Sequence, residues 1–88
     1  MIKLPRYTVR ITHQAKKDIE KLTPQLKKKL KDILENILVY HPYQGKKLIG
    51  DLSGSYSHRL TFRDRILYSI DEKQKIIYIE RARTHYGE

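Results

Sequence analysis

The chain has 88 residues, 39% of them hydrophobic, and this length predicts one small domain, residues 1–88, without room for a dinucleotide-binding fold. Because there is no cysteine, disulfides, cysteine-zinc sites and thiol catalysis are excluded, and with only four scattered histidines we expect no metal ion and no cofactor. The 19 Lys and Arg residues outnumber the 10 Asp and Glu residues, and this net charge of +9 predicts a polyanion or an acidic protein as partner.

The first half of the chain predicts a strand followed by two helices. Tyr7–Ile11 alternates apolar with polar residues, which is typical of a strand, and Thr12 can cap the helix that follows. A second helix begins at Thr23-Pro24, where a capping residue precedes a proline at the first helical position. It carries a single apolar stripe and should end near His41, since Pro42 disfavours helical geometry in the residue before it.

The second half predicts a loop and then strands. Turn-forming residues predict a loop from Pro42 to Gly54, after which the hydrophobic period changes to two. Strands are predicted at Tyr56–Thr61, Arg65–Ile70 and Lys75–Arg81. The order β-α-α-β-β-β predicts an α+β fold, in which the two helices cover one face of a small, mostly antiparallel sheet.

Pairing between two of these strands would bring two arginines together. A three-residue loop at 62–64 pairs Leu60 with Ile66 on the covered face. Arg59 then lies diagonally beside Arg65 on the uncovered face. Because like charges held close are destabilising unless an anion lies between them, this arrangement predicts an anion-binding site.

Several cationic and aromatic residues have the chemistry needed to cleave RNA without a metal ion. In that reaction the 2′-OH of the RNA attacks the adjacent phosphorus, which requires a base, an acid and cations. Histidine titrates in the right range, arginine binds phosphate through two parallel hydrogen bonds, and tyrosine stacks on an unpaired base. For His85 the alternative is an ordinary tail residue. The candidates are Arg59, Arg65, Arg83, His85 and Tyr86, with Lys46 and Lys47 on the preceding loop.

Three segments form a more specific pattern. They are LIGDLSGSYSHRL at residues 48–60, RILYSI at 65–70 and RARTHY at 81–86. The pattern resembles the RelE/ParE superfamily of type II toxins, and within it most closely the YoeB/Txe branch. The resemblance extends over nearly the whole chain in the element order predicted above. It implies a ribosome-dependent mRNA endonuclease that is neutralised by a small antitoxin encoded beside it.

The resemblance also implies roles for individual residues. Arg65 matches the catalytic arginine of the branch, and His85 matches its catalytic histidine, which acts as the general acid. Tyr86 matches the aromatic residue that closes such chains, although Gly87 and Glu88 follow it here, and Arg59 falls where the RelE branch places a basic catalytic residue. Lys46 stands where the YoeB branch places a glutamate, its general base. A protonated lysine there is a poor base but suits the stabilisation of charge on phosphorus, and we expect His85 and at least one of Lys46 and Lys47 to share the proton transfers and the charge stabilisation.

We therefore expect two groups of site residues. The expected catalytic residues are Arg65, His85, Arg59 and Lys46. The expected RNA-binding residues are Lys47, Arg63, Arg83 and Tyr86. The alternative for Lys46 and Lys47 is that both are solvated loop residues that contact only ribosomal RNA.

The resemblance implies a cognate antitoxin, the ribosome and mRNA as partners, and it leaves open whether two copies of the chain pair. No segment approaches the ~18 consecutive apolar residues of a membrane span, and the first residues lack the apolar core of a signal peptide. We therefore expect a cytoplasmic protein without a membrane partner. Two alternatives are a ParE-like toxin that inhibits DNA gyrase without hydrolysis, and an inactive remnant that only binds its antitoxin. The Arg59/Arg65 pair and the His-Tyr ending favour the nuclease.

Overall fold

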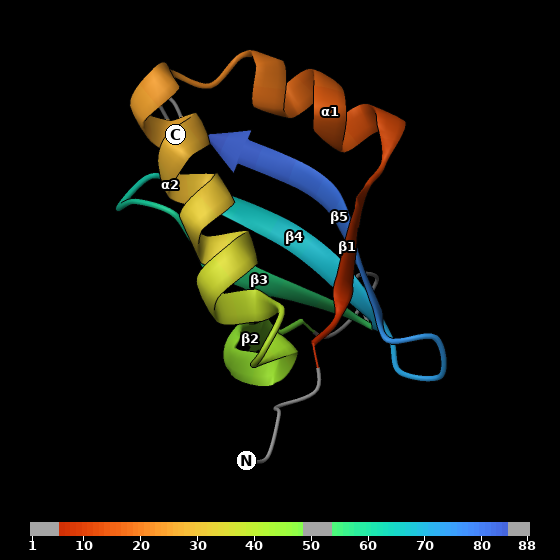
Figure 1. Ribbon diagram of the computed structural model, residues 1–88. Helices are drawn as coiled ribbons and strands as arrows, with labels where there is room; N and C mark the ends of the chain where they lie inside the picture. Colours follow the sequence, from red (N-terminus) through yellow and green to blue (C-terminus); the bar gives the residue numbers. More distant parts are fainter. Residues whose placement is uncertain (1–5, 49–53, 85–88) are drawn as a thin grey trace.

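A computed structural model describes residues 6–48 and 54–84 (Figure 1). The predicted α+β class and element order are confirmed, but the segment predicted as a loop from Pro42 to Gly54 also contains a short helical turn and a short strand. The elements are β1 (Thr8–Ile11), α1 (His13–Glu20), α2 (Pro24–Ile33), the π-helical turn η1 (Leu34–Leu38), the 3-10 turn η2 (Pro42–Gln44), β2 (Lys46–Lys47), β3 (Ser55–Arg59), β4 (Asp64–Asp71) and β5 (Ile76–Thr84).

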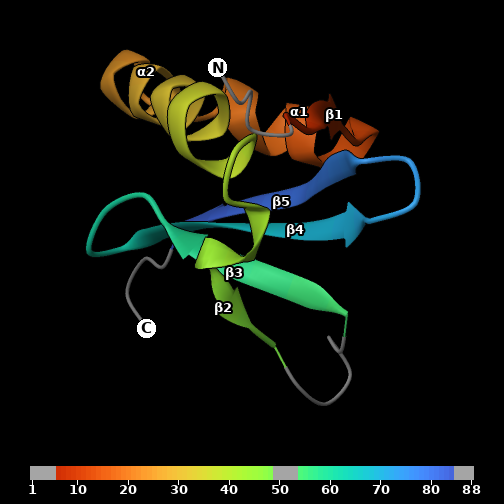
Figure 2. The same ribbon diagram turned by 60° about the horizontal axis from the view of Figure 1, so that its bottom comes forward.

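The strands form one five-stranded sheet in the order β1-β5-β4-β3-β2. β1 runs parallel to β5, and the other neighbours are antiparallel. Both helices lie on the same side of the sheet, so no helix of residues 6–48 and 54–84 covers its opposite face (Figure 2). Within the described residues, no helix is long and apolar enough to cross a membrane.

Local sequence signals explain where the helices begin and end. The Thr12 hydroxyl accepts the Ala15 N–H at 3.1 Å and caps α1, as predicted. The Thr23 hydroxyl caps α2 in the same way, at 3.2 Å from the Leu26 nitrogen. Helical structure continues from α2 through η1 to Leu38, and His41 has left helical geometry, as expected for a residue before proline.

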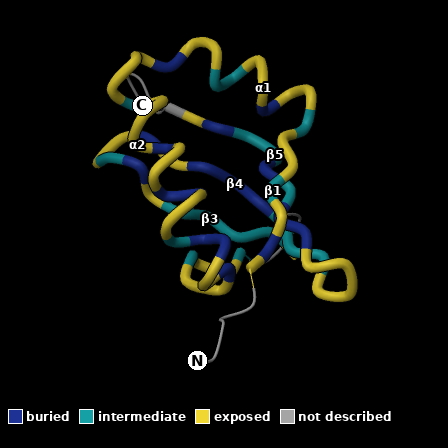
Figure 3. Tube along the Cα trace, in the orientation of Figure 1, coloured by how far each residue is buried: buried dark blue, intermediate teal, exposed yellow. Residues whose placement is uncertain are grey.

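The core lies between the helices and the covered face of the sheet (Figure 3). Ile66 and Tyr68 of β4 and Ile77 and Ile79 of β5 are fully buried there. Burying an aliphatic side chain of this size contributes about 1.5–3 kcal/mol. The residues that face them from the helices and from the α1–α2 connection are Ala15, Leu22, Leu30, Ile33, Leu34 and Leu38.

The predicted pairing of Leu60 with Ile66 is wrong. Arg59 pairs with Arg65, and His58 pairs with Ile66. The connecting loop is longer than three residues because it closes on Asp64, whose main-chain oxygen accepts the Leu60 N–H at 2.7 Å and whose carboxylate accepts the hydroxyl of Thr61 at 2.6 Å. The shift is two residues, so each side chain keeps its predicted face and the two arginines become direct neighbours.

A second irregularity lies between β4 and β5. Tyr68 pairs with Ile79, whereas Leu67 pairs with Arg81, so Glu80 is an extra residue in β5. Such a β-bulge reverses the faces of the residues beyond it. Ala82 is therefore buried and Arg83 is exposed.

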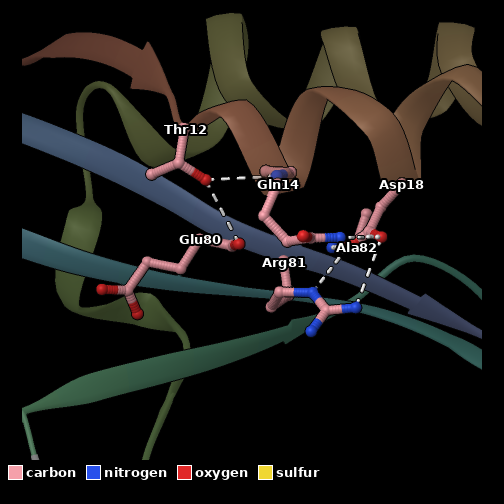
Figure 4. Close-up of polar contacts among 7 residues, drawn as sticks. Thr12, Gln14, Asp18, Glu80, Arg81 and Ala82 are labelled. Carbon is pink, nitrogen blue, oxygen red and sulfur yellow. Dashed lines mark hydrogen bonds and ion pairs between the residues drawn. The ribbon is translucent and has the colours of Figure 1, made fainter.

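Helix α1 supports the bulge (Figure 4). β1 ends opposite Ile79, and beyond that point Asp18 of α1 provides the acceptor that a neighbouring strand would provide. Its carboxylate accepts the Ala82 N–H at 3.1 Å and the Arg81 Nε–H at 2.7 Å, while the Thr12 hydroxyl donates to the Glu80 carbonyl at 3.3 Å. The hydrogen bond from Arg81 is the main reason why the pKa of Asp18 lies below its ordinary value.

We predict that Asp18→Asn lowers the free energy of unfolding at pH 7 by about 2 kcal/mol, the usual contribution of hydrogen bonds to a charged group. Because the folded-state pKa of Asp18 is lowered, its stabilisation is complete above the unfolded-state pKa of about 4 and is lost as the pH falls through the folded-state pKa. The difference between wild type and variant should therefore shrink in acid, as measured by urea unfolding at several pH values.

Glu20→Gln is the matched control, because Glu20 is an exposed carboxylate on the same helix. We expect it to change the free energy of unfolding by less than about 0.5 kcal/mol. A difference for Asp18→Asn that stays constant from neutral to acidic pH would contradict the ionic role of Asp18.

Candidate nucleic-acid site

Three arginines from three neighbouring strands lie side by side on the uncovered face. Arg65 of β4 pairs with Arg59 of β3 on one side and with Arg83 of β5 on the other. All three side chains are exposed. Because adjacent strands are about 4.8 Å apart, the three Cα atoms span about 10 Å. We call Arg59, Arg65 and Arg83 the arginine row.

Among the described residues, no ion pair compensates the positive charge of the arginine row. The ion pairs within the described residues are Arg81 with Asp18 and Lys75 with Glu72, so none of these carboxylates neutralises the row. Like charges directly opposite each other in a sheet are mutually destabilising. A phosphate bound beside the row would offset that repulsion, and a guanidinium group can donate two parallel hydrogen bonds to it.

The two candidate lysines lie on opposite faces of the sheet. Lys46 pairs with Ser57, two residues before Arg59, so it lies on the face of the arginine row and diagonal to Arg59, about 7–8 Å away. Lys47 pairs with Tyr56 and therefore lies on the opposite face of β2. The geometry brings Lys46 to the site and separates Lys47 from it.

The remaining candidates lie at the rim of the site or outside the described residues. Arg63 is exposed in the turn between β3 and β4, where its N–H donates to the Thr61 hydroxyl at 3.2 Å. Arg81, which has the same chemistry as the arginine row, is already engaged by Asp18 at 2.7 Å. His85 and Tyr86 lie outside the described residues, so their expected roles remain predictions.

Sequence reasoning missed two features of the site. The bulge at Glu80 was not predicted, although Ala82, a small apolar residue between two arginines, is a signal that the alternation changes phase there. The contacts of Tyr68 with the segment before Lys46 were also missed. For these there was no signal, because a buried tyrosine in a strand does not reveal where its hydroxyl points.

Comparisons with solved structures place the chain among toxins. A chain of the RelBE2 toxin–antitoxin complex of Mycobacterium tuberculosis is 32% identical, with a TM-score of 0.85, and the match covers 94% of this chain and 95% of that one. A chain of the YoeB–YefM toxin–antitoxin complex of Staphylococcus aureus is 26% identical, with a TM-score of 0.65 and coverage of 92% and 99%. The YoeB/ParE toxin of Agrobacterium tumefaciens, 23% identical, shares the fold, with a TM-score of 0.78 and coverage of 90% and 99%.

A comparison with curated protein sequences finds no match. The family model of the ParE-like toxin of type II bacterial toxin–antitoxin systems matches residues 9–87, which is nearly the whole chain. Together with the RelBE2 match, this confirms the superfamily that the sequence motifs predict. The chain therefore belongs to the ParE-like toxins of type II bacterial toxin–antitoxin systems, within the RelE/ParE superfamily.

Proposed function

We propose that this toxin is an mRNA endonuclease that acts on the translating ribosome in the cytoplasm. The observation that carries the proposal is the arginine row, three exposed guanidinium groups side by side with no carboxylate partner among the described residues. Such a cluster suits a phosphate whose charge increases during the reaction. The net charge of +9 supports docking on ribosomal RNA through phosphate contacts.

The proposed reaction is attack by the 2′-OH of the RNA on the adjacent phosphorus. A bond forms from the 2′-oxygen to phosphorus, the bond from phosphorus to the 5′-oxygen breaks, and a cyclic phosphate results. The 2′-OH gives up a proton, and the departing 5′-oxygen receives one from a general acid, which we assign to His85. The 2′-OH proton passes to solvent water, because Lys46, which stands where the YoeB branch places a glutamate, is a poor base in its protonated form.

Cations supply the electrostatic part of this proposal. Arg65, in the centre of the row, stabilises the charge that gathers on the phosphoryl oxygens. Arg59 lies beside Arg65, and Lys46 lies diagonal to Arg59 on the next strand. Arg83 and the rim residue Arg63 hold neighbouring phosphates of the RNA. Tyr86 stacks on a base near the cleaved bond, and Lys47 contacts ribosomal RNA.

We predict that Arg65→Ala and His85→Gln each lower the rate of mRNA cleavage on translating ribosomes by about 10²-fold or more, the usual effect of removing a charge stabiliser or a positioned acid. Arg65 is exposed, so its truncation leaves no cavity and the fold should persist by circular dichroism. The matched control is Lys73→Ala, which removes one positive charge from an exposed turn between β4 and β5. A folded Arg65→Ala variant with wild-type cleavage would refute the assignment.

One experiment separates the nuclease from the gyrase inhibitor. Toeprinting on translating ribosomes should reveal toxin-dependent mRNA cleavage, while DNA supercoiling by gyrase should be unaffected at the same toxin concentration. Inhibition of supercoiling without cleavage would instead identify a ParE-like gyrase inhibitor. If neither activity is found, although the antitoxin is bound, the chain is an inactive remnant.

We further propose that the antitoxin contacts a groove between β1 and α2. The groove has a volume of about 350 Å³, and its floor is apolar. Lys27 and Lys31 lie on its rim beside Glu35, which suits an acidic segment with apolar anchors. The RelBE2 and YoeB–YefM structures are toxin–antitoxin complexes, which supports an antitoxin as the occupant. The floor residues are Val9, Ile11, Ile19, Leu30, Leu34 and Val39.

We predict that Ile11→Asp weakens antitoxin binding at least tenfold and leaves cleavage by the free toxin unchanged. Ile11 is 47% exposed in the groove, so an aspartate there is tolerated by the fold but repels an acidic segment and removes an apolar contact. Arg10→Gln is the matched control, because it changes the net charge by the same amount on the opposite face of β1. Equal losses of affinity in both variants, measured by calorimetry, would mean that net charge and not the groove drives the complex.

A further inference from the structure

The segment that precedes β2, residues 42–45, is hydrogen-bonded to the sheet through one buried hydroxyl group. Tyr68 of β4 has no exposed surface. Its hydroxyl donates to the Pro42 carbonyl at 2.7 Å and accepts the Gly45 N–H at 3.1 Å. The hydroxyl therefore joins both ends of η2, and we call this arrangement the Tyr68 clasp.

Gly45 allows the chain to approach this closely. A Cβ atom at Gly45 would lie 2.4 Å from the Tyr68 hydroxyl oxygen and 2.8 Å from the main-chain oxygen of Ser57. Both distances are shorter than any ordinary contact, and the second atom belongs to the backbone, which cannot turn away. The backbone at Gly45 therefore packs directly against β3 and β4.

Lys46 directly follows Gly45, and strand β2 makes few other contacts that would fix its position. The strand consists of Lys46 and Lys47 only and lies at the edge of the sheet. Its ladder is extended by one more hydrogen bond, from the Leu48 N–H to the Ser55 carbonyl at 2.9 Å. So short an edge strand frays easily, and the Tyr68 clasp fixes its first residue relative to the arginine row.

Aromatic packing keeps the hydroxyl in place. The ring of Tyr68 stacks on that of Tyr56 at 5.6 Å between centroids, and Tyr56 meets Tyr43 edge-on at 5.7 Å. Burial raises the pKa of Tyr68 to about 12, so the hydroxyl keeps its proton and remains a donor. On the outer side, Tyr43 donates a hydrogen bond to Glu72, but this side chain is half exposed and fastens the segment less firmly.

We propose that the hydroxyl of Tyr68 is a positioning group for Lys46 in RNA cleavage. It does not touch the substrate; it sets where the lysine lies beside Arg59 and Arg65. This inference rests on the proposed function, because it concerns the site assigned there. By this inference Tyr68, whose side chain lies on the covered face of the sheet, affects the cleavage of a phosphate bound on the opposite face.

The test is a double-mutant cycle of Tyr68→Phe and Lys46→Ala, measured as the single-turnover cleavage rate with saturating ribosomes. Each single variant should cleave about tenfold more slowly than wild type, and the double variant should be no slower than Lys46→Ala alone. Tyr56→Phe is the matched control: it removes a hydroxyl from the same stack, and that hydroxyl makes no hydrogen bond to the described residues. It should cleave at the wild-type rate.

Amide hydrogen exchange gives a readout that does not depend on activity. In Tyr68→Phe the Gly45 amide should exchange at least tenfold faster, while the amides of Ile66 and Ile77 in the core keep their protection. Should Tyr68→Phe not fold, Gly45→Ala takes its place in the cycle, since its Cβ forces the same contact apart.

The possible failures are distinct. Unchanged exchange at Gly45 would overturn the clasp itself. If Lys46→Ala cleaves normally, the role of this lysine in the proposed function is wrong, and the inference fails with it. If Lys46→Ala is impaired but Tyr68→Phe is not, or if the two losses simply multiply in the double variant, the lysine acts in cleavage without positioning by Tyr68.

Discussion

The β-bulge at Glu80 determines which side chains share the uncovered face with Arg65. Without the extra residue, the register seen at Tyr68 and Ile79 would continue, and Ala82 would lie opposite Arg65. Arg83 would then point into the core, where a charged group is costly. The bulge turns Ala82 inward and Arg83 outward, so both the packing beneath the sheet and the arginine row above it depend on the same irregularity. Helix α1 stabilises the bulge through Thr12 and Asp18.

Two arginines of β5, on either side of Ala82, differ in whether an ion pair within the fold engages their charge. Arg81 is paired with a partly buried carboxylate that also accepts a backbone N–H, so its charge belongs to the scaffold. Arg83 instead pairs with Arg65, and Arg59 lies on the far side of Arg65. Repulsion within the arginine row lowers the stability of the fold. Because of this cost, we interpret the row as a binding site and not as ordinary surface charge.

The order of elements, the helix caps and the covered face of each strand could be predicted, because each follows from a local pattern: Thr12 and Thr23 before helices, and period two in the strands. Register could not. The loop after Arg59 depends on how Asp64 folds back onto Leu60 and Thr61, and the bulge depends on an acceptor supplied by Asp18, which lies 64 residues away from Ala82 in sequence. The arginine pair was predicted for the right face, but direct pairing and the third arginine required these long-range contacts.

The position of β5 in the sheet has a consequence for how the chain folds. It is the last strand in chain order, yet it lies between β1 and β4, and Thr8 at the start of β1 pairs with Ile76. Until β5 has been synthesised, β1 has no strand to pair with and α1 has no bulge to bind, so the N-terminal half cannot bury its apolar face. Formation of the complete sheet is thereby postponed until β5 has been synthesised. The arginine row therefore does not exist in a growing chain until β5 has paired with β4.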